Sequence, residues 1–296
     1  MWWLIAVLIG SACYAFSNVI DNYFSNKLFR DIPSLVFYAS LFNILFIPLI
    51  FFKEIPSFPA LVELPYFIIL GFTGVAYLFP YYKALQHDDT SIVVSLFSFG
   101  KIFVPFLAFF LVHERLSVFQ YLGFIIIIIS SALLTLNNPQ KLQFNASLYY
   151  MFIVSILIAI EGVIYKHLFA SLSWATGLVW SLVFTFMFSL FLFLVPKNRR
   201  NIISQAHHFK QNFHYFLIEE LATFGGTAFK TLAITTASLT LVEGVMSFLP
   251  FFVLAYALLF STLFPHIFKE KIKARDLIKK GLLFILMIIG VILSVQ

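Results

Sequence analysis

One stretch, YYKALQHDDTSIVVSLFSFGKIFVPFLAFFLVHERLS (residues 81–117), shows what kind of protein this chain must form. Polar turns at 87–91 and 112–117 enclose an apolar segment, 90–112, and a helix needs about 20 such residues to cross a bilayer. Lipid offers the backbone no hydrogen bonds, so such a segment is stable there as a helix. The stretch therefore predicts a membrane-spanning helix with one charge, Lys101, near its middle.

The same test applied to the rest of the sequence predicts ten spanning helices. Their limits are 2–23, 33–52, 64–86, 90–112, 117–136, 147–169, 174–195, 213–236, 239–264 and 276–295. The composition agrees, because 61% of the 296 residues are hydrophobic and only 11% are charged, against about 25% in soluble domains. We therefore expect an all-α, multi-pass integral membrane protein of the cell inner (plasma) membrane, with no soluble domain.

Composition also bears on partners. Cys13 is the single cysteine, so the chain forms no internal disulfide. The net charge of +6 is small and lies in the loops, which suits a membrane surface rather than nucleic acid. The N-terminus MWWLIAVLIG has no basic region before its apolar run, so we interpret it as the first spanning helix and not as a signal peptide. We expect a small-molecule solute and membrane lipids as partners, no nucleic acid, and a monomer or homodimer.

The order of residues indicates that the ten helices are five helices used twice. A shift of 144 positions places SACYAFSNVIDNYFSNKL (11–28) over SILIAIEGVIYKHLFASL (155–172), with identical residues at five positions. An odd number of helices in each repeat makes the second copy enter the membrane in the opposite direction. The sequence thus predicts two inverted five-helix repeats, residues 1–136 and 147–296.

Three short patterns surround the fourth predicted helix. They are an aromatic-x-Ala-Leu before it, a Glu-Arg-Leu-Ser after it, and a Gln-x-x-Gly that opens the fifth helix. The residues are Tyr82, Ala84, Leu85, Glu114, Arg115, Leu116, Ser117, Gln120 and Gly123. In this respect the first half resembles the EamA-type members of the drug/metabolite transporter (DMT) superfamily. In the second half, Glu270 takes the place of Glu114.

The resemblance implies a ten-helix transporter without cofactors. In that family helices 1–4 and 6–9 line a pathway between the halves, and helices 5 and 10 pack outside. The charges agree, because the apolar cores of 117–136 and 276–295 contain no ionisable residue. The family more usually has a proline at the position of Lys101, and here Pro105 follows one turn later. We expect Pro105 and Pro250, in the fourth helices of the two halves, to kink those helices.

Lys101 is the candidate site residue that stands out. Insertion scales put a lysine at the centre of a spanning helix at about 2.5–3.5 kcal/mol, so it should face the bundle interior and find a partner. The buried acids available are Glu161, Glu219, Glu220 and Glu243. We expect the pairs Lys101–Glu161 and Lys101–Glu220 first. The alternative is a purely structural pair that holds helices together.

Other polar residues extend the candidate site. Lys230 shares a helix face with Glu219 but lies about 16 Å further along the axis, so each needs a different partner. Further candidates for substrate binding or coupling are Asn18, Asp21, Asn43, Tyr77, Tyr81 and Trp180. The alternative for any one of these is an ordinary interhelical hydrogen bond, of about 0.6 kcal/mol on average.

These residues favour a secondary transporter that moves an amino acid or amine-like solute by alternating access, with proton exchange at Glu161 or Glu220 as the coupling to be tested. Ammonium groups bind both carboxylates and aromatic faces, and a lysine can meet a carboxylate. A lipid or lipid-linked flippase of the same fold is the main alternative. A membrane-embedded enzyme and a channel are weaker ones, since no catalytic motif occurs and no filter-like loop recurs. QHDD at 86–89 reads as a solvated turn rather than a metal site.

The loops make a prediction about orientation. Those after the odd-numbered helices carry eleven Lys or Arg residues, and the opposite side carries three. The positive-inside rule then places both termini outside the cytoplasm. Members of the family more often have both termini inside, so the two arguments disagree.

Overall fold

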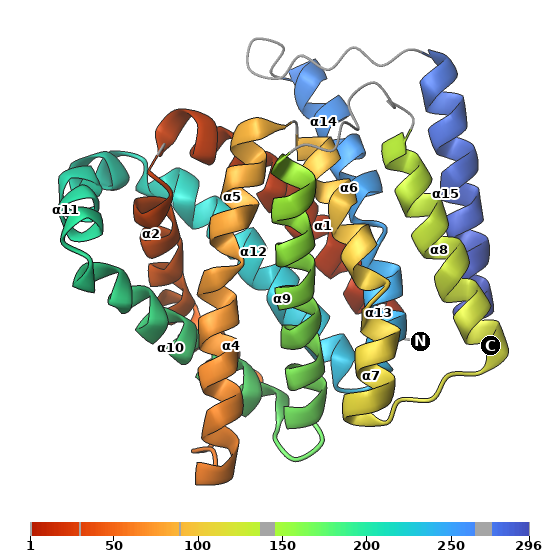
Figure 1. Ribbon diagram of the computed structural model, residues 1–296, viewed down its shortest axis with the longest axis horizontal. Coiled ribbons are helices and arrows are strands. Elements are labelled where there is room, and N and C mark those ends of the chain that lie inside the picture. Colours follow the sequence, from red (N-terminus) through yellow and green to blue (C-terminus); the bar gives the residue numbers. More distant parts are fainter. Residues whose placement is uncertain (1, 30, 89, 137–145, 264–273, 296) are drawn as a thin grey trace.

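The computed structural model describes residues 2–29, 31–88, 90–136, 146–263 and 274–295, and every regular element in these ranges is a helix (Figure 1). The first half contains α1 (Trp2–Tyr23), the π-helical turn η1 (Phe24–Leu28), α2 (Ile32–Leu45), α3 (Ile47–Ile50), the 3-10 turn η2 (Leu61–Glu63), α4 (Leu64–Ala76), α5 (Leu78–His87), α6 (Thr90–Lys101), α7 (Val104–Val112) and α8 (Val118–Leu136). The all-α fold predicted from the sequence is confirmed.

The regular elements that the structure describes in the second half are also helices. This half contains α9 (Ala146–Leu168), α10 (Trp174–Leu190), the 3-10 turn η3 (Phe191–Leu194), α11 (Pro196–Gln211), α12 (Phe213–Ile234), α13 (Leu239–Met246), α14 (Leu249–Leu263) and α15 (Ala274–Val295). Each of the ten predicted spans corresponds to one helix or to consecutive helices.

Six of the described helical segments are long and apolar enough to cross a membrane. They are Trp2–Leu28, Ile32–Ile50, Leu61–His87, Ala146–Leu168, Trp174–Leu194 and Leu239–Tyr256, and two shorter apolar helices cover Val118–Leu133 and Gly281–Ser294. The other two predicted spans are helical as well. One is divided after Lys101, and the other, α12, carries three charges.

Three helices end four residues before a proline, at the residue whose carbonyl group the proline cannot serve as a hydrogen-bond donor. A proline has no N–H for the carbonyl four residues before it, and its ring clashes with that carbonyl. The helix ends at Lys101 before Pro105 and at Met246 before Pro250. α4 likewise ends at Ala76, four residues before Pro80. The helices expected to kink at Pro105 and Pro250 are thus interrupted there, by short turns whose backbone stays close to helical at Phe103 and Ser247.

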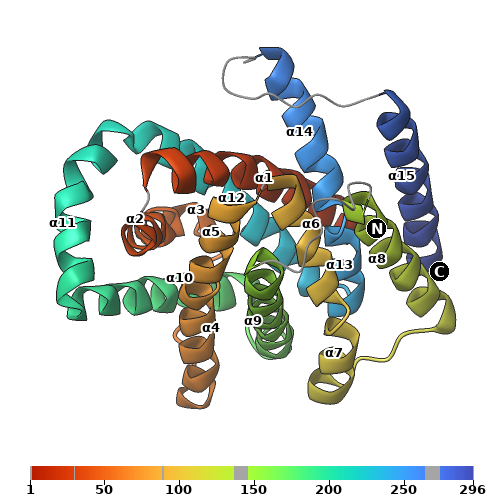
Figure 2. The same cartoon turned by 45° about the horizontal axis from the view of Figure 1, so that its top comes forward.

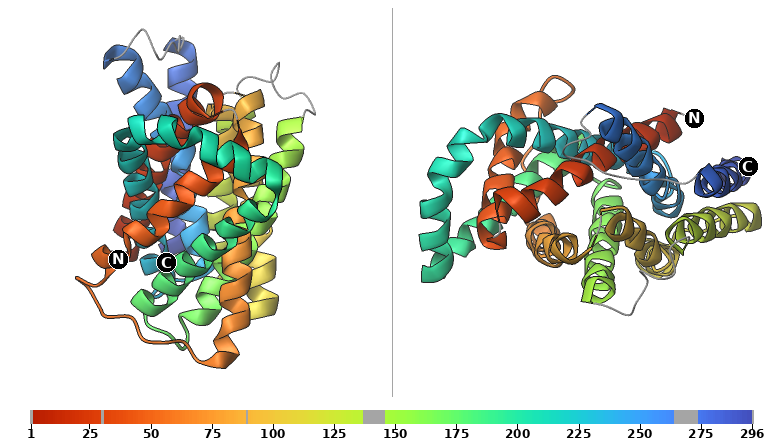
Figure 3. Two further views of the ribbon diagram at one scale, coloured as in Figure 1. Left: turned by 90° about the vertical axis from the view of Figure 1, so that its left-hand side faces the viewer. Right: turned by 90° about the horizontal axis from the view of Figure 1, so that it is seen from above.

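The helices α8 and α15 lie side by side at one edge of the molecule, as Figures 1 and 3 both show. Gly123 and Gly290 allow this close approach, since a Cβ atom on Gly123 would lie 2.4 Å from the carbonyl oxygen of Gly290. Small residues let helices in a membrane pack backbone against backbone. The pair corresponds to helices 5 and 10 of the prediction.

α11 is an element that we had expected to be a loop. Its sequence, PKNRRNIISQAHHFKQ, is too polar to span a membrane, but its buried face packs on the first half. Tyr38 donates a hydrogen bond to the carbonyl oxygen of Ile202 at 2.5 Å and stacks on Phe209, and the Asn201 amide donates to Asp31 at 2.7 Å. Figure 2 shows α11 connecting α10 to α12 at the edge opposite α8 and α15.

Candidate functional site

A cavity of about 170 Å³ lies between the helices. Its lining residues come from α1, α2, α4, α5 and α6 of the first half and from α9, α10, α12, α13 and α14 of the second. Among the residues that the structure describes, none that lines the cavity comes from α8 or α15. This matches the partition implied by the family resemblance, in which helices 5 and 10 stay outside the pathway.

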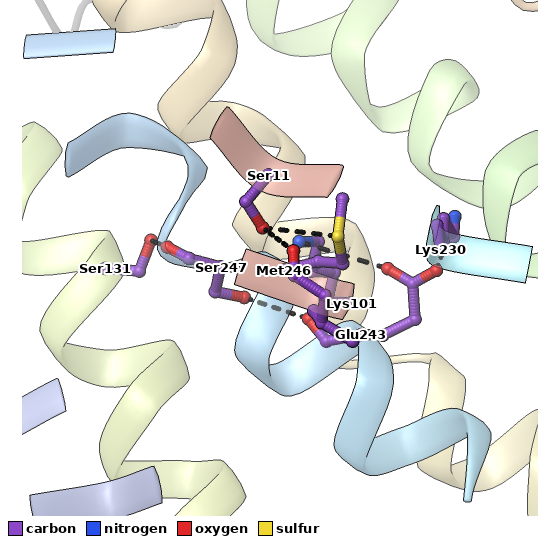
Figure 4. A network of polar contacts seen from close by, with 8 residues as sticks. Ser11, Lys101, Ser131, Lys230, Glu243, Met246 and Ser247 are labelled. Carbon is purple, nitrogen blue, oxygen red and sulfur yellow. Dashed lines mark hydrogen bonds and ion pairs between the residues drawn. The ribbon is translucent and has the colours of Figure 1, made fainter. Parts of the chain in front are cut away.

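One wall of the cavity holds an ion triad (Figure 4). The Nζ atom of Lys230 lies 2.6 Å from Oε1 of Glu243, and the Nζ atom of Lys101 lies 3.9 Å from Oε2 of the same carboxylate. The three side chains are 3–12% exposed. The structure thus places Lys101 against Glu243, and not against Glu161 or Glu220, the pairs that we had expected first.

The helix breaks explain why the triad forms there. Lys101 is the last residue of α6, and Glu243 lies one turn before the end of α13, so the two broken helices meet with their charges facing each other. Lys230 reaches the same point from α12. Ser11 of α1 donates to the carbonyl oxygen of Val7 and lies 3.3 Å from the sulfur of Met246, which closes the triad on the α1 side.

A second cluster consists of the three carboxyl groups of Asp21, Glu219 and Glu220, and we call it the acidic cluster. Their side chains belong to residues only 2–7% exposed, and Asp21 interacts electrostatically with both glutamates. Among the described residues, no Lys or Arg forms an ion pair with any of the three. Oε2 of Glu219 is buried and has no hydrogen-bond partner in the described part of the chain.

Hydroxyl groups hold the acidic cluster in place. Tyr81 donates within 3.0 Å to Asp21 and lies 2.8 Å from the side-chain oxygen of Asn18, and Tyr82 donates to Asp21 at 3.2 Å. Ser17 donates to Glu219 at 2.6 Å. These donors satisfy some of the carboxylate oxygens of Asp21 and Glu219, and all three residues line the cavity.

Glu161 lines the cavity from α9, and no hydrogen bond or ion pair joins it to another described residue. With it, five carboxyl groups and two lysines line the cavity among the described residues. The lysines share one carboxylate, Glu243. The cavity therefore has more carboxyl groups, which attract a cation, than lysine ammonium groups, which are cations themselves.

Nine of the candidate site residues line this cavity: Asn18, Tyr77, Tyr81, Lys101, Glu161, Glu219, Glu220, Lys230 and Glu243. Asn43 and Asp21 do so as well. Trp180 is not among the lining residues. Its indole N–H donates to the carbonyl oxygen of Ser57 at 2.9 Å, because α10 presents Leu182 to the cavity and Trp180 lies about 200° away around the helix.

Several lining residues were missed by the sequence reasoning. On α12, Thr223 and Thr227 lie between Glu219 and Lys230 on the same face, at spacings of three and four residues. On α1, Tyr14 donates to or accepts from Thr227 at 2.8 Å. The sequence signal that could have identified Thr223 and Thr227 is the continuous polar stripe on α12. Considering only the charged residues of that helix did not reveal it.

The described residues thus define a multi-pass helical membrane protein with a charged cavity between its two halves. Residues 1–136 match the EamA-like transporter family, so the resemblance noted in the sequence is confirmed. This family consists of membrane transporters of the DMT superfamily, which are generally not enzymes. No curated protein matches the chain.

A solved structure shares the fold over almost the whole chain. It is described only as the crystal structure of a protein, and it has a TM-score of 0.65 and 13% identity, covering 98% of this chain and 96% of that one. At this level of identity the likeness shows the fold alone. It extends the agreement beyond the residues of the family match to the second half.

Proposed function

We propose that this protein is a secondary transporter that moves a small polar metabolite with an ammonium group, an amino acid or amine-like solute, by alternating access. The observation that carries the proposal is the acidic cluster of Asp21, Glu219 and Glu220, which faces the cavity without a cationic partner among the described residues. Carboxylates in a low-dielectric site repel one another, and an ammonium group relieves that repulsion.

The size of the cavity supports a small solute. An apolar cavity of about 150 Å³ holds a benzene molecule, so about 170 Å³ accommodates a metabolite with a similar or slightly larger number of heavy atoms. Charges on several of its walls favour a polar solute over the acyl chains that a flippase would handle.

Two parts of the cavity suit different groups of such a solute. The acidic cluster attracts an ammonium group. Lys101 is 3.9 Å from its carboxylate, a longer distance than the 2.6 Å of Lys230, so its ammonium group is the one available to a carboxylate of the solute. This arrangement supports an amino acid over a simple amine.

Proton exchange at Glu161 or Glu220 is the coupling that we propose. Glu161 has no partner among the described residues, and Glu220 lies beside Glu219 in the acidic cluster. Each of these carboxyl groups can release a proton when the solute binds and take one up when the solute leaves. Neither step breaks an ion pair of the fold.

The proposal is tested by uptake into proteoliposomes with a panel of amino acids, polyamines and quaternary amines. We expect saturable uptake of at least one of them, and a loss of at least tenfold in Lys101→Ala. Lys210→Ala is the matched control, because Lys210 is exposed on α11 and does not line the cavity.

Protein yield and size-exclusion profile establish that the Lys101 variant is folded. Saturable uptake with unchanged kinetics in that variant would remove Lys101 from the proposed site. No uptake of any member of the panel would overturn the substrate class.

A further inference from the structure

The polar turn after α7 contacts the opposite half of the molecule through Glu114. Its Oε2 atom accepts a hydrogen bond from the backbone N–H of Leu239 at 2.7 Å, and its Oε1 atom accepts from Thr240 at 3.0 Å. These are the first two N–H groups of α13, which have no partner within the helix. Glu114 of the first half therefore caps the helix of the second half that carries Glu243.

Lys166 holds the other side of the same turn. Its Nζ atom donates to the carbonyl oxygen of Ile234 at 3.0 Å and to that of Ala237 at 2.7 Å. Ile234 is the last residue of α12, and Ala237 belongs to the turn that leads to α13. Two opposite charges thus bind the two sides of one short connection, residues 235–238.

The backbone aims Glu114 at this connection. His113 ends α7 in the left-handed conformation, with φ of 54°, and the N–H of Glu114 donates back to the carbonyl oxygen of Ala108 at 3.1 Å. A histidine in this region is uncommon and costs free energy, so it persists where the surrounding contacts require it. The helix end is therefore built to direct the Glu114 side chain across the interface.

The connection matters for the cavity because it carries two of the triad residues. Lys230 lies four residues before the end of α12, and Glu243 lies four residues after the start of α13. Their 2.6 Å pair is thus one turn of helix from the contacts of Glu114 and Lys166 on either side. A movement of the 235–238 connection would separate Lys230 from Glu243.

We propose that Glu114 and Lys166 form a clamp that closes the cavity at the α12–α13 end, and that release of this clamp opens that end. The inference rests on the proposed function, because opening at alternate ends is what such a transporter requires. Glu114 and Lys166 are positioning residues, since neither lines the cavity. They act through the helix ends that carry Lys230 and Glu243.

The test measures access to the cavity and does not depend on knowing the solute. In a Cys13→Ser background, Thr227→Cys places one thiol in the cavity, and a membrane-impermeant maleimide is added to one side of proteoliposomes at a time. Val62→Cys, at an exposed position near α4, identifies the side on which the clamp lies. The readout is the rate of labelling from each side.

We expect slow labelling from the clamp side in the otherwise unchanged chain. The double variant Glu114→Gln/Lys166→Met should raise this rate at least tenfold. If the double variant does not fold, the single variant Lys166→Gln replaces it, and it should raise the labelling rate by a smaller factor. Glu63→Gln is the matched control, because Glu63 accepts hydrogen bonds from Ala60 and Ser171 at the same end but does not touch the 235–238 connection.

The proposal is overturned if labelling from the clamp side is already as fast as from the other side, or if the folded clamp variants leave it unchanged. Uptake measured in the same vesicles addresses the proposed function separately. Altered access in the clamp variants without any uptake supports the clamp and contradicts the substrate class. Uptake with unaltered access supports the substrate class and contradicts the clamp.

Discussion

Lys101 and Lys230 share the carboxylate of Glu243, but they do so unequally. Lys230 lies 2.6 Å from one oxygen and Lys101 lies 3.9 Å from the other. Removing the close partner of a buried charge is strongly destabilising, and a partner at a longer distance compensates for less of that loss. Lys230 is therefore expected to serve the fold, and Lys101 to remain free for a solute.

This difference predicts different stabilities for two identical substitutions. Lys230→Met removes the close partner of Glu243 and should lower the free energy of unfolding by about 3–5 kcal/mol, the range for breaking a buried pair. Lys101→Met leaves the Lys230–Glu243 pair intact and should cost clearly less. Thermal unfolding in detergent measures both, with Lys210→Met as the control. Equal losses would mean that the two lysines contribute equally to the fold.

At the level of single residues, sequence reasoning named every Asp, Glu and Lys among the described lining residues of the cavity, but fewer than half of the lining residues overall. It succeeded because an ionisable residue in an apolar span must face the interior, as Lys101, Glu161 and Glu243 do. It placed Lys101 with the wrong first partners because pairing depends on where α6 and α13 break. It included Trp180, whose type suits a binding site but whose position on α10 faces away.

At the level of elements, the prolines set where helices end. Pro105 and Pro250 were expected to bend their helices, and the structure shows that α6 and α13 end four residues before them. The break before Pro80 follows the same rule and was not predicted. α11 was missed because a polar helix on the rim gives no spanning signal, and its buried contacts with Tyr38 and Asp31 lie far away in the sequence.

The contact between α8 and α15 gives a prediction about packing. A Cβ atom on Gly123 would lie 2.4 Å from the carbonyl oxygen of Gly290 and 2.7 Å from the N atom of Ser294, and backbone cannot move aside as a side chain can. We expect Gly123→Ala to separate the two helices and to cost about 1–3 kcal/mol, as overpacking does.

Gly281→Ala, in α15, is the matched control, because a Cβ atom there meets nothing within 4 Å. Since alanine favours helix over glycine by up to about 1 kcal/mol, this control should be neutral or slightly stabilising. Thermal unfolding in detergent compares the two variants. A neutral Gly123→Ala would show that the α8–α15 contact does not constrain the fold.

At the level of the whole molecule, the division into repeats of residues 1–136 and 147–296 stays a prediction, and so does the orientation. The ten spans were predictable because their lengths and polar turns are local properties of the sequence. The cavity was not, because its walls combine helices from both halves. Accessibility of a tag at each terminus decides between the charge bias, which places both termini outside, and the habit of the family.

A pH gradient tests the coupling that we propose. If Glu161 or Glu220 exchanges a proton during each cycle, an imposed gradient across proteoliposomes should drive accumulation of the solute, and its reversal should drive release. Glu161→Gln and Glu220→Gln should each be compared, and the variant of the coupling residue should retain exchange but lose the response to the gradient. Transport that is indifferent to the gradient in the unchanged chain would contradict proton coupling.

The contacts that hold the ends of α5 and α12 differ in charge. The shift of 144 residues aligns Asn22 with Lys166, and both donate to the end of the third helix of their own half: Asn22 and Asn26 reach the carbonyl oxygen of Leu85 at 3.5 and 2.9 Å. Neutral amides are insensitive to ionic strength, whereas a contact with Glu114 and Lys166 weakens as salt screens it. Salt would then favour opening at the end held by Glu114 and Lys166 only. The populations of the two conformations at rest would therefore depend on the ionic strength. The preferred direction of transport would depend on it in the same way.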